Sequence, residues 1–154
     1  MKIESSGIVN GKILDKYGKR GLDSRFGMPT HSLPIKILDK PEGTKSYALI
    51  MEDYDAVKVC NKVWIHWLVA NLYSDHIEED SSSNGATYIQ GVNSWNDNSY
   101  GGPCPPDAPH TYTITCYALN CALPLRGGFS KEMLLKSMEG KVLAMAKLEG
   151  VYDN

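Results

Sequence analysis

Three segments of the chain have the hydrophobic pattern of β-strands, and the longest is Val63 to Leu72. This run contains mainly β-branched and aromatic residues without polar alternation, which predicts a strand buried on both faces. We expect its first part, Val63 to Ala70, to be a central strand in which Trp64, Ile65 and Val69 are largely buried.

The other two segments lie before and after this run in the sequence. Ser46 to Glu52 is rich in β-forming residues and ends at a pair of acidic residues. Thr111 to Leu119 alternates, so Tyr112, Ile114 and Cys116 share one face and the threonines share the other. Together the three segments predict a core made of strands.

The opening third of the chain is punctuated by turn residues. Glycines follow asparagine, tyrosine, arginine and phenylalanine at short intervals, which is typical of short strands joined by turns. His31 to Leu38 contains Pro34, and proline fits an edge strand or a bulge better than a central strand.

A helix is predicted near the C-terminus. Ser130 is in position to cap it, its apolar residues Met133, Leu134 and Met138 follow helical spacing, and Gly140 would end it. This is the clearest helical pattern in the chain.

The remaining C-terminal residues predict a further helical turn near Val142 to Ala146 and a last strand from Lys147 to Tyr152. The predominance of strands in this order favours a mainly β fold, a β-sandwich with short peripheral helices near the C-terminus. We expect residues 1–154 to form a single domain, since 154 residues is an ordinary domain length.

Two long connections differ in character. Asp75 to Gly85 is acidic and serine-rich, which predicts a solvated loop without evident chemistry. Gly91 to His110 is rich in proline and glycine and has no periodic pattern, and long structureless segments inside a domain are usually functional or disordered. Pro103, Pro105 and Pro106 stiffen this segment and favour an ordered functional loop.

Composition and charge exclude several classes of function. The chain has 16 basic and 18 acidic residues, interspersed, with a net charge of -2, so no nucleic-acid-binding surface is indicated. Residues 1–25 contain no signal-peptide pattern, and no segment approaches the ~20 apolar residues of a membrane span. We therefore expect a cytoplasmic protein without an integral membrane segment.

The four cysteines, Cys60, Cys104, Cys116 and Cys121, have no C-x-x-C spacing. This argues against a zinc knuckle or a thioredoxin-type motif and favours reduced thiols.

Four titratable residues are candidates for chemistry. Asp53 and Asp55 are spaced so that both carboxylates lie on one side of an extended chain, although such a pair can also be a solvated turn. His66 shares its predicted strand face with Trp64 and Leu68, and it can equally be a core histidine with satisfied hydrogen bonds. His110, where the proline-rich loop meets a strand, can equally be an exposed loop histidine.

The order of four motifs makes the chain resemble the phosphatidylethanolamine-binding protein family, and especially its prokaryotic branch. The resemblance covers nearly the whole chain, including the ending from Lys141 to Tyr152. The motifs are Asp53-Tyr54-Asp55-Ala56, the strand from Trp64 to Asn71, the loop from Tyr100 to Pro106, and His110-Thr111-Tyr112.

This resemblance implies a Greek-key β-sandwich with a pocket for a phosphate-like anion or a phospholipid headgroup, and it implies no cofactor and no metal. Carboxylates would orient the imidazoles and raise their pKa values, mainly at His110, so that N–H donors face the anion. The site residues carried over from the family are Asp53, Asp55, His66, Pro105, Pro106, His110 and Tyr112.

Two departures from the family pattern affect the expected ligand. Tyr54 stands where the family has proline and can reach the pocket rim, and Thr111 stands where it has arginine. The ligand preference of relatives therefore does not transfer directly.

The leading hypothesis is a non-catalytic binding or regulatory protein, monomer or homodimer, because family members are described as inhibitors of kinases or serine proteases. The alternative is a hydrolase in which the Asp and His residues hold a metal ion or act as acid and base. A weaker alternative is a cysteine hydrolase that uses Cys104 with His110, for which no G-x-S-x-G elbow is present.

Overall fold

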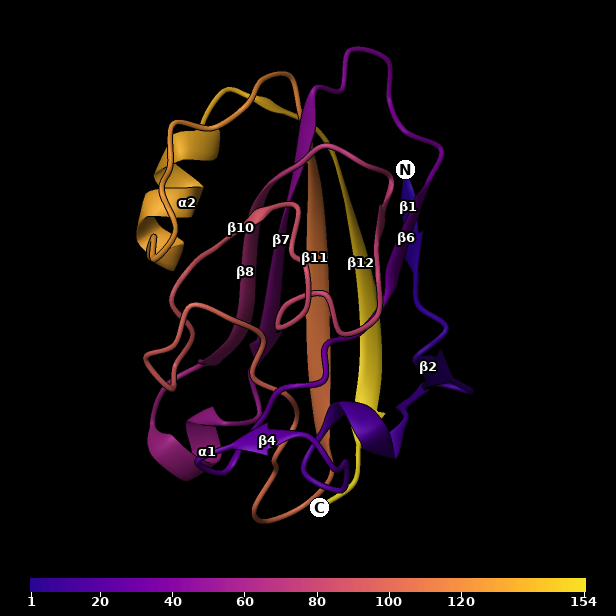
Figure 1. The fold of residues 1–154 in the computed structure, drawn as a ribbon, viewed down its shortest axis with the longest axis vertical. Coiled ribbons are helices and arrows are strands. Elements are labelled where there is room, and N and C mark those ends of the chain that lie inside the picture. Colours follow the sequence, from indigo (N-terminus) through magenta and orange to yellow (C-terminus); the bar gives the residue numbers. More distant parts are fainter.

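The computed structural model describes residues 1–154 and consists mainly of strands (Figure 1). It also contains two α-helices, α1 (Val57–Cys60) and α2 (Lys131–Met138), and one 3-10 turn at Asp15–Tyr17. The strands are β1 (Lys2–Glu4), β2 (Ile8–Val9), β3 (Lys12–Ile13), β4 (Ser24–Arg25), β5 (Met28–Pro29), β6 (Ile35–Leu38), β7 (Ser46–Asp53), β8 (Trp64–Leu72), β9 (His76–Ile77), β10 (Ile89–Gln90), β11 (His110–Leu119) and β12 (Val142–Tyr152).

The main sheet has seven strands in the order β10-β8-β7-β11-β12-β3-β2. Its four long strands, β8, β7, β11 and β12, are antiparallel, and β12 pairs in parallel with β3. Because β8 and β11 lie on opposite sides of β7, the chain between them crosses over that strand, as a Greek-key connection requires. A second sheet has the order β1-β6-β9, and β4 and β5 form a separate hairpin.

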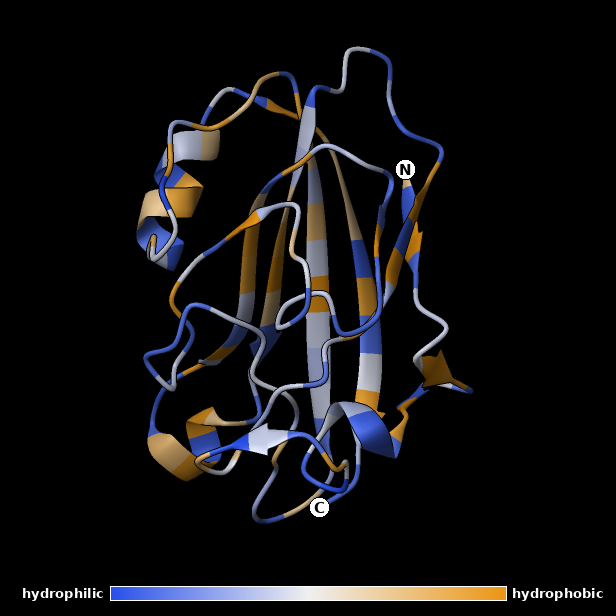
Figure 2. Cartoon of the chain, in the orientation of Figure 1, coloured by the Kyte–Doolittle hydropathy of each residue, from blue (hydrophilic) through white to orange (hydrophobic).

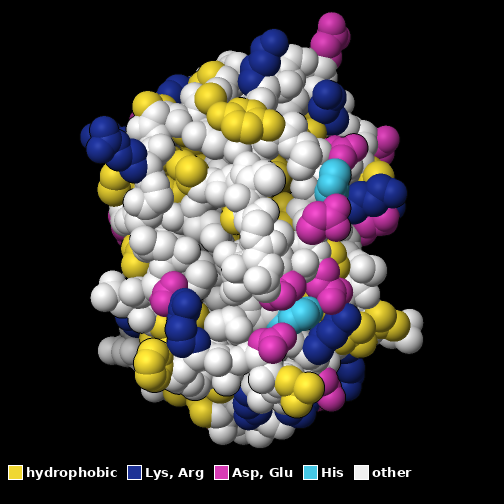
Figure 3. Space-filling model, viewed as in Figure 1, with side chains coloured by type: hydrophobic (Ala, Val, Ile, Leu, Met, Phe, Trp, Pro, Cys, Tyr) yellow, Lys and Arg dark blue, Asp and Glu magenta, His cyan; other side chains and the backbone are white.

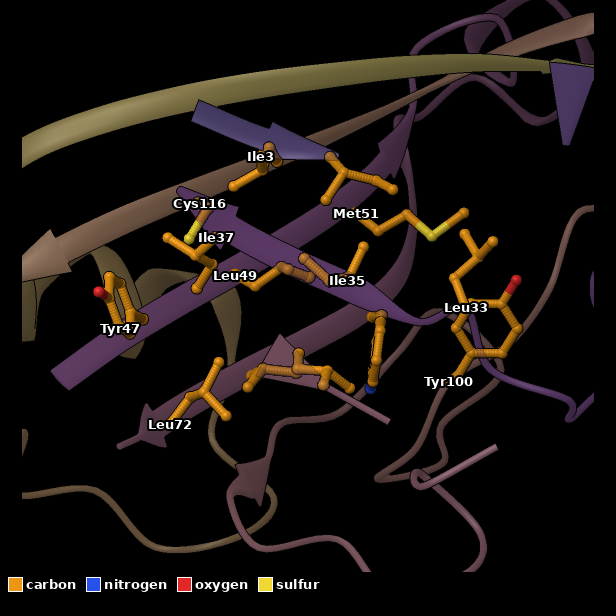
Figure 4. Packing of buried hydrophobic residues seen from close by; sticks show 14 of the residues in the cluster. Ile3, Leu33, Ile35, Ile37, Tyr47, Leu49, Met51, Leu72, Tyr100 and Cys116 are labelled. Atoms are coloured by element: carbon orange, nitrogen blue, oxygen red, sulfur yellow. The ribbon is translucent and has the colours of Figure 1, made fainter. Parts of the chain in front are cut away.

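The main sheet is covered on both faces. The three-stranded sheet packs on one face, where 20 buried residues form the larger hydrophobic cluster (Figure 4). Helix α2 packs on the other face through Leu134 and Met138, which contact a cluster containing Ile50 and Leu68. The predicted mainly β, sandwich-like fold with a helix near the C-terminus is therefore confirmed.

Burial on both faces explains the hydrophobic runs. Every residue of β7 is buried, and so are five consecutive residues of β8, from His66 to Ala70. Figure 2 colours much of these two strands as hydrophobic. On β11, Tyr112, Ile114 and Cys116 belong to the larger cluster, as the alternation predicted. Val69 is fully buried, as predicted, and Trp64 and Ile65 keep part of their surface exposed at the end of the sheet.

Two predictions on local structure need correction. Val142 to Ala146 is part of the 11-residue strand β12, not a helical turn, because it pairs along β11 from Leu119 back to Cys116. Pro34 does not mark an edge strand. It directly precedes β6, which is the middle strand of its sheet, so its missing N–H falls outside the ladder.

Helix α2 begins as predicted. The Ser130 side chain accepts a hydrogen bond from the backbone N–H of Met133, and Gly140 adopts a φ of 75° just beyond the helix. Helix α1 has no sequence signal of comparable strength and was not predicted. It follows Asp53, whose Oδ1 accepts hydrogen bonds from the N–H groups of Asp55 and Ala56.

The acidic segment from Asp75 to Gly85 is not merely a solvated loop. It contains β9 and the buried side chain of Ser81, and Glu79 accepts a hydrogen bond from Tyr17 Oη at 2.5 Å. His31 contacts the same carboxylate at 3.0 Å.

Histidines exposed on the face in Figure 3 lie beside acidic side chains, and basic and acidic groups are intermixed there. None of the helices has the length and apolar character needed to cross a bilayer.

Candidate functional site

Strand register brings three of the candidate segments to one end of the main sheet. Asp53, at the end of β7, pairs with Trp64 on β8 and with Tyr112 on β11. The side chains of these three residues line a pocket of about 280 Å³ beside α1. The full lining is Asp53, Ala56, Val59, Cys60, Trp64, His66, Trp95, Cys104, Pro105, Pro106, His110 and Tyr112.

A larger hollow of about 650 Å³ lies over β1, β6 and β9 and contains none of the predicted site residues. The pocket at the end of the main sheet is therefore the one in which the predicted residues meet.

A β-bulge directs His66 into this pocket. The pairing of β7 with β8 shifts by one residue, since Met51 pairs with Trp67 and Glu52 pairs with Ile65, which leaves His66 as the extra residue. Bulges re-aim side chains and are common near functional sites. Alternation predicted that His66 and Leu68 lie on the same face of the strand. They do not, because Leu68 packs in the cluster under α2 whereas His66 lines the pocket.

The bulge places the His66 ring among aromatic side chains. Its centroid lies 5.0 Å from that of Tyr112 and 5.2 Å from that of Trp95, both edge to face. Its Nδ1 atom lies 2.6 Å from the carbonyl oxygen of Gly101. Because a carbonyl can only accept, Nδ1 carries the proton. Gly101 also donates its N–H to the carbonyl oxygen of His66, which joins the proline-rich loop to β8.

His66 is neutral at physiological pH. Its pKa is lowered to about 4, chiefly by burial and also by the neighbouring His110, and the hydrogen bond to Gly101 only partly opposes this fall. With Nδ1 protonated, the other ring nitrogen, Nε2, is an acceptor. The expectation of an imidazole N–H donor aimed at an anion therefore does not hold for His66.

His110 lies between two carboxylates. Its Nδ1 is 2.7 Å from Asp53 Oδ2 and its Nε2 is 2.7 Å from Asp107 Oδ1. Burial alone would lower the pKa of His110, but the two carboxylates outweigh burial and raise it above the ordinary value. Both ring nitrogens are thus occupied, and neither N–H is free in this conformation.

The side chain of Asp53 connects the His110 ring to the end of β7. Burial raises the pKa of Asp53, and the hydrogen bonds from His110 and from the N–H groups of Asp55 and Ala56 oppose that rise. The carboxylate thus accepts from the ring on one oxygen and from the start of α1 on the other.

Asp55 and Tyr54 are not part of the pocket lining. Asp55 Oδ2 accepts a hydrogen bond from the N–H of Thr111 at 2.9 Å, which fixes the start of β11 next to His110. Tyr54 points away and donates its hydroxyl to Glu52 at 2.7 Å, so it does not reach the rim. The Asx-turn at Asp53 turns the chain after β7 and separates the two carboxylates that an extended chain would have placed together.

Tyr112 lies at the floor of the pocket with its side chain fully buried. Burial raises the pKa of its phenol, and the charge of Asp53 raises it further, so the hydroxyl stays protonated. The predicted proline wall is present as Pro105 and Pro106.

Two residues important to the site were not among the predictions. Trp95 forms a wall of the pocket and contacts Trp64 edge to face at 5.3 Å. The indole N–H of Trp64 is buried without a hydrogen-bond partner. Asp107 could have been noticed as an acidic residue three positions before His110, but nothing in its pattern separates it from a solvated loop residue.

No group of three or more His, Cys, Asp or Glu side chains is arranged to hold a metal ion. All four cysteines are free thiols. The metal-assisted alternative thus has no ligand cluster in this pocket.

Comparison with known proteins places these features in a family. The family model described as phosphatidylethanolamine-binding protein matches residues 4–153. The protein YxkA of Bacillus subtilis is 38% identical over 157 residues, covering 92% of this chain and 94% of its own length. The UPF0098 protein of Chlamydia muridarum is 41% identical over 124 residues, covering 79% of this chain and 82% of its own length.

Two solved structures have the same fold. A phosphatidylethanolamine-binding protein homolog from Chlamydia trachomatis aligns with a TM-score of 0.87 at 35% identity, covering 99% of this chain and 97% of its own. YbcL of Escherichia coli, described as a member of the mammalian family, aligns with a TM-score of 0.83 at 26% identity, covering 99% and 98%. The chain therefore belongs to the phosphatidylethanolamine-binding protein family.

Proposed function

We propose that the pocket binds a small phosphate-bearing ligand and that the protein acts as a binding protein. The observation that carries this proposal is the convergence of Asp53, His66, His110 and Tyr112, from three strands, on one hollow with apolar walls. Pockets that combine apolar walls with a few convergent polar groups are the usual form of small-molecule sites.

The polar groups restrict the chemistry of the ligand. His66 Nε2 accepts at neutral pH, so it pairs with a ligand hydrogen, such as the P–OH of a phosphate monoanion or an ammonium N–H. The hydroxyl of Tyr112, a residue of the pocket lining, is a donor suited to phosphate oxygens. A ligand that carries both a phosphate group and a hydrogen donor satisfies both kinds of group.

The size and walls of the pocket favour a headgroup over a whole lipid. Its volume of about 280 Å³ is at the small end of ligand sites. Trp64, Trp95 and Val59 supply apolar surface around the polar groups. The family name is consistent with a phosphoethanolamine headgroup, and free phosphate has the same anionic chemistry.

Isothermal titration calorimetry distinguishes these sources. Inorganic phosphate, phosphoethanolamine and glycerophosphoethanolamine are titrated into the wild-type protein and into the variants His66→Phe and His76→Phe. His76 is an exposed histidine outside the pocket and serves as the matched control. We expect binding by the wild type and the control, and at least tenfold weaker binding by His66→Phe. If none of the three ligands binds the wild type, the proposal is wrong.

A further inference from the structure

The strongest unassigned feature of the molecule is the contact between Asp107 and His110. Asp107 lies outside the pocket lining, directly after the rim residues Pro105 and Pro106. Its Oδ1 nevertheless occupies the Nε2 side of a ring that is itself a lining residue. Asp53 contacts Nδ1 of His110, so Nε2 is the only ring nitrogen that could contact a ligand, and the Asp107 carboxylate contacts it instead.

The two carboxylates on His110 differ in how firmly they are held. The side chain of Asp53 is 5% exposed and accepts two further hydrogen bonds from backbone N–H groups. The side chain of Asp107 is 44% exposed and lies in a bend without regular secondary structure. Asp107 can therefore rotate into water, where a carboxylate is well solvated, whereas Asp53 cannot.

The charges lead to the same conclusion. Asp53, protonated His110 and Asp107 together carry one net negative charge, and His66 is neutral. A phosphate group entering the pocket would meet a carboxylate at the position where it needs a donor. When Asp107 leaves, the remaining pair of Asp53 and His110 is neutral overall and Nε2–H becomes free to donate.

We propose that Asp107 is an internal competitor of the anionic ligand, and that a phosphate group binds by displacing its carboxylate from His110 Nε2. This inference rests on the proposed function and adds a residue that sets the affinity of the site. Because only the fraction of molecules with Asp107 displaced is competent for this hydrogen bond, the apparent affinity is reduced by that fraction. Asp107 also favours ligands that carry a positive charge, because that charge compensates for the negative charge of its carboxylate.

The experiment compares phosphate binding by the wild type, Asp107→Ala, Asp107→Asn and the control Asp75→Ala. Asp75 is the matched control because its carboxylate also contacts a histidine, His76 Nδ1 at 3.0 Å, and lies outside the pocket. All four proteins are titrated with inorganic phosphate at pH 7 by calorimetry, after thermal melts have confirmed that each is folded.

We expect Asp107→Ala to bind phosphate about fivefold more tightly, the scale expected for removing one partly exposed competing ion pair. Asp107→Asn should show a smaller gain, because the amide oxygen can still accept from Nε2 without the charge. Asp75→Ala should bind as the wild type does. Tighter phosphate binding by Asp107→Ala than by both the wild type and Asp75→Ala would support the competition.

Three outcomes would contradict the competition. Equal or weaker binding by Asp107→Ala would overturn it and leave the proposed function in place. An equal gain in Asp75→Ala would show that only net charge matters. Absence of phosphate binding in all four proteins would overturn the competition, whereas the proposed function fails only if phosphoethanolamine and glycerophosphoethanolamine do not bind either. A second readout is the pKa of His110 from NMR titration, which must fall in Asp107→Ala if the contact exists in solution.

Discussion

The Nδ1 atom of His66 lies 2.6 Å from the carbonyl oxygen of Gly101, and this contact joins the proline-rich loop to the main sheet. It also determines which ring nitrogen faces the ligand. Protonation of Nε2 would place a positive charge in a buried site, which is why the pKa of His66 is lowered to about 4.

We predict that His66 makes the protein less stable in mild acid. An unfolded histidine has a pKa of about 6.5, so between that value and about 4 the unfolded state binds the extra proton. Stability is therefore fully present above pH 6.5 and falls as pH decreases, by roughly 3 kcal/mol in total. Urea unfolding between pH 4 and 7 measures this loss.

The matched variant is His66→Asn, whose side-chain amide can still donate to the carbonyl oxygen of Gly101 and does not titrate in this range. Its free energy of unfolding should decrease less between pH 7 and 4 than that of the wild type. An identical decrease in both proteins would assign the acid sensitivity to other groups.

The second prediction concerns the buried pair of Asp53 and His110. Asp53→Asn keeps an oxygen for the N–H groups at the start of α1 but removes the charge that holds the proton on His110. The pKa of His110 should fall, and the free energy of unfolding at pH 6 should decrease by about 1–3 kcal/mol. NMR titration and urea unfolding measure the two effects.

The sign of the pH dependence distinguishes this pair from His66. Because folding raises the pKa of His110, its contribution is fully present below about 6.5 and is lost as pH rises through the folded value. This alkaline loss should be smaller in Asp53→Asn. If the variant keeps the wild-type profile above pH 6.5, the pair does not determine it.

Much of the fold follows from local patterns, because the strongest strands are buried on both faces. β7, β8 and β11 were predicted within a few residues, and so was the helix capped by Ser130. Val142 to Ala146 was misassigned because its apolar residues fit a short helical turn, and only pairing with β11 decides for a strand. Tertiary pairing commonly overrides local propensity in this way.

The site was predictable as a set of residues but not as a set of hydrogen bonds. Strict alternation assigned His66 to the same face as Leu68. The bulge adds one residue to β8, so the side chains beyond it point to the opposite face from the one that alternation predicts. The turn after Asp53 separated Asp55 from the pocket. Asp107 gave no signal at all, because an acidic loop residue gains a partner only once the loop has folded back on His110.

The third prediction tests the packing of the loop that carries Gly101 and Gly102. A Cβ atom on Gly102 would overlap the backbone carbonyl oxygen of Tyr17 and press on Pro29. Gly102→Ala should lower the free energy of unfolding by about 1–3 kcal/mol, as overpacking does. Gly127→Ala is the control, since its nearest neighbour would be Gln90 O at 3.8 Å. Equal stabilities of the two variants in urea would contradict the close packing.

The last prediction is the pH dependence of ligand binding. If a phosphate group accepts a hydrogen bond from His110 Nε2, affinity should be highest while His110 is protonated and should weaken as pH rises through its raised pKa. A phosphodiester such as glycerophosphoethanolamine has no phosphate ionisation between pH 5 and 8, whereas the second pKa of a monoester lies near 6. Calorimetry with the diester over that range therefore isolates the protein groups.

The other ionisable groups around His110 are Asp53 on β7, His66 on β8, Tyr112 on β11, Cys60 on α1, and Cys104 and Asp107 on the loop. His66 is already neutral throughout this range and Tyr112 stays protonated, so neither produces the decline. In Asp107→Ala the decline should shift to lower pH, because His110 loses one of the two carboxylates that raise its pKa. An affinity that is constant between pH 5 and 8 in both proteins would show that the phosphate does not accept a proton held by His110.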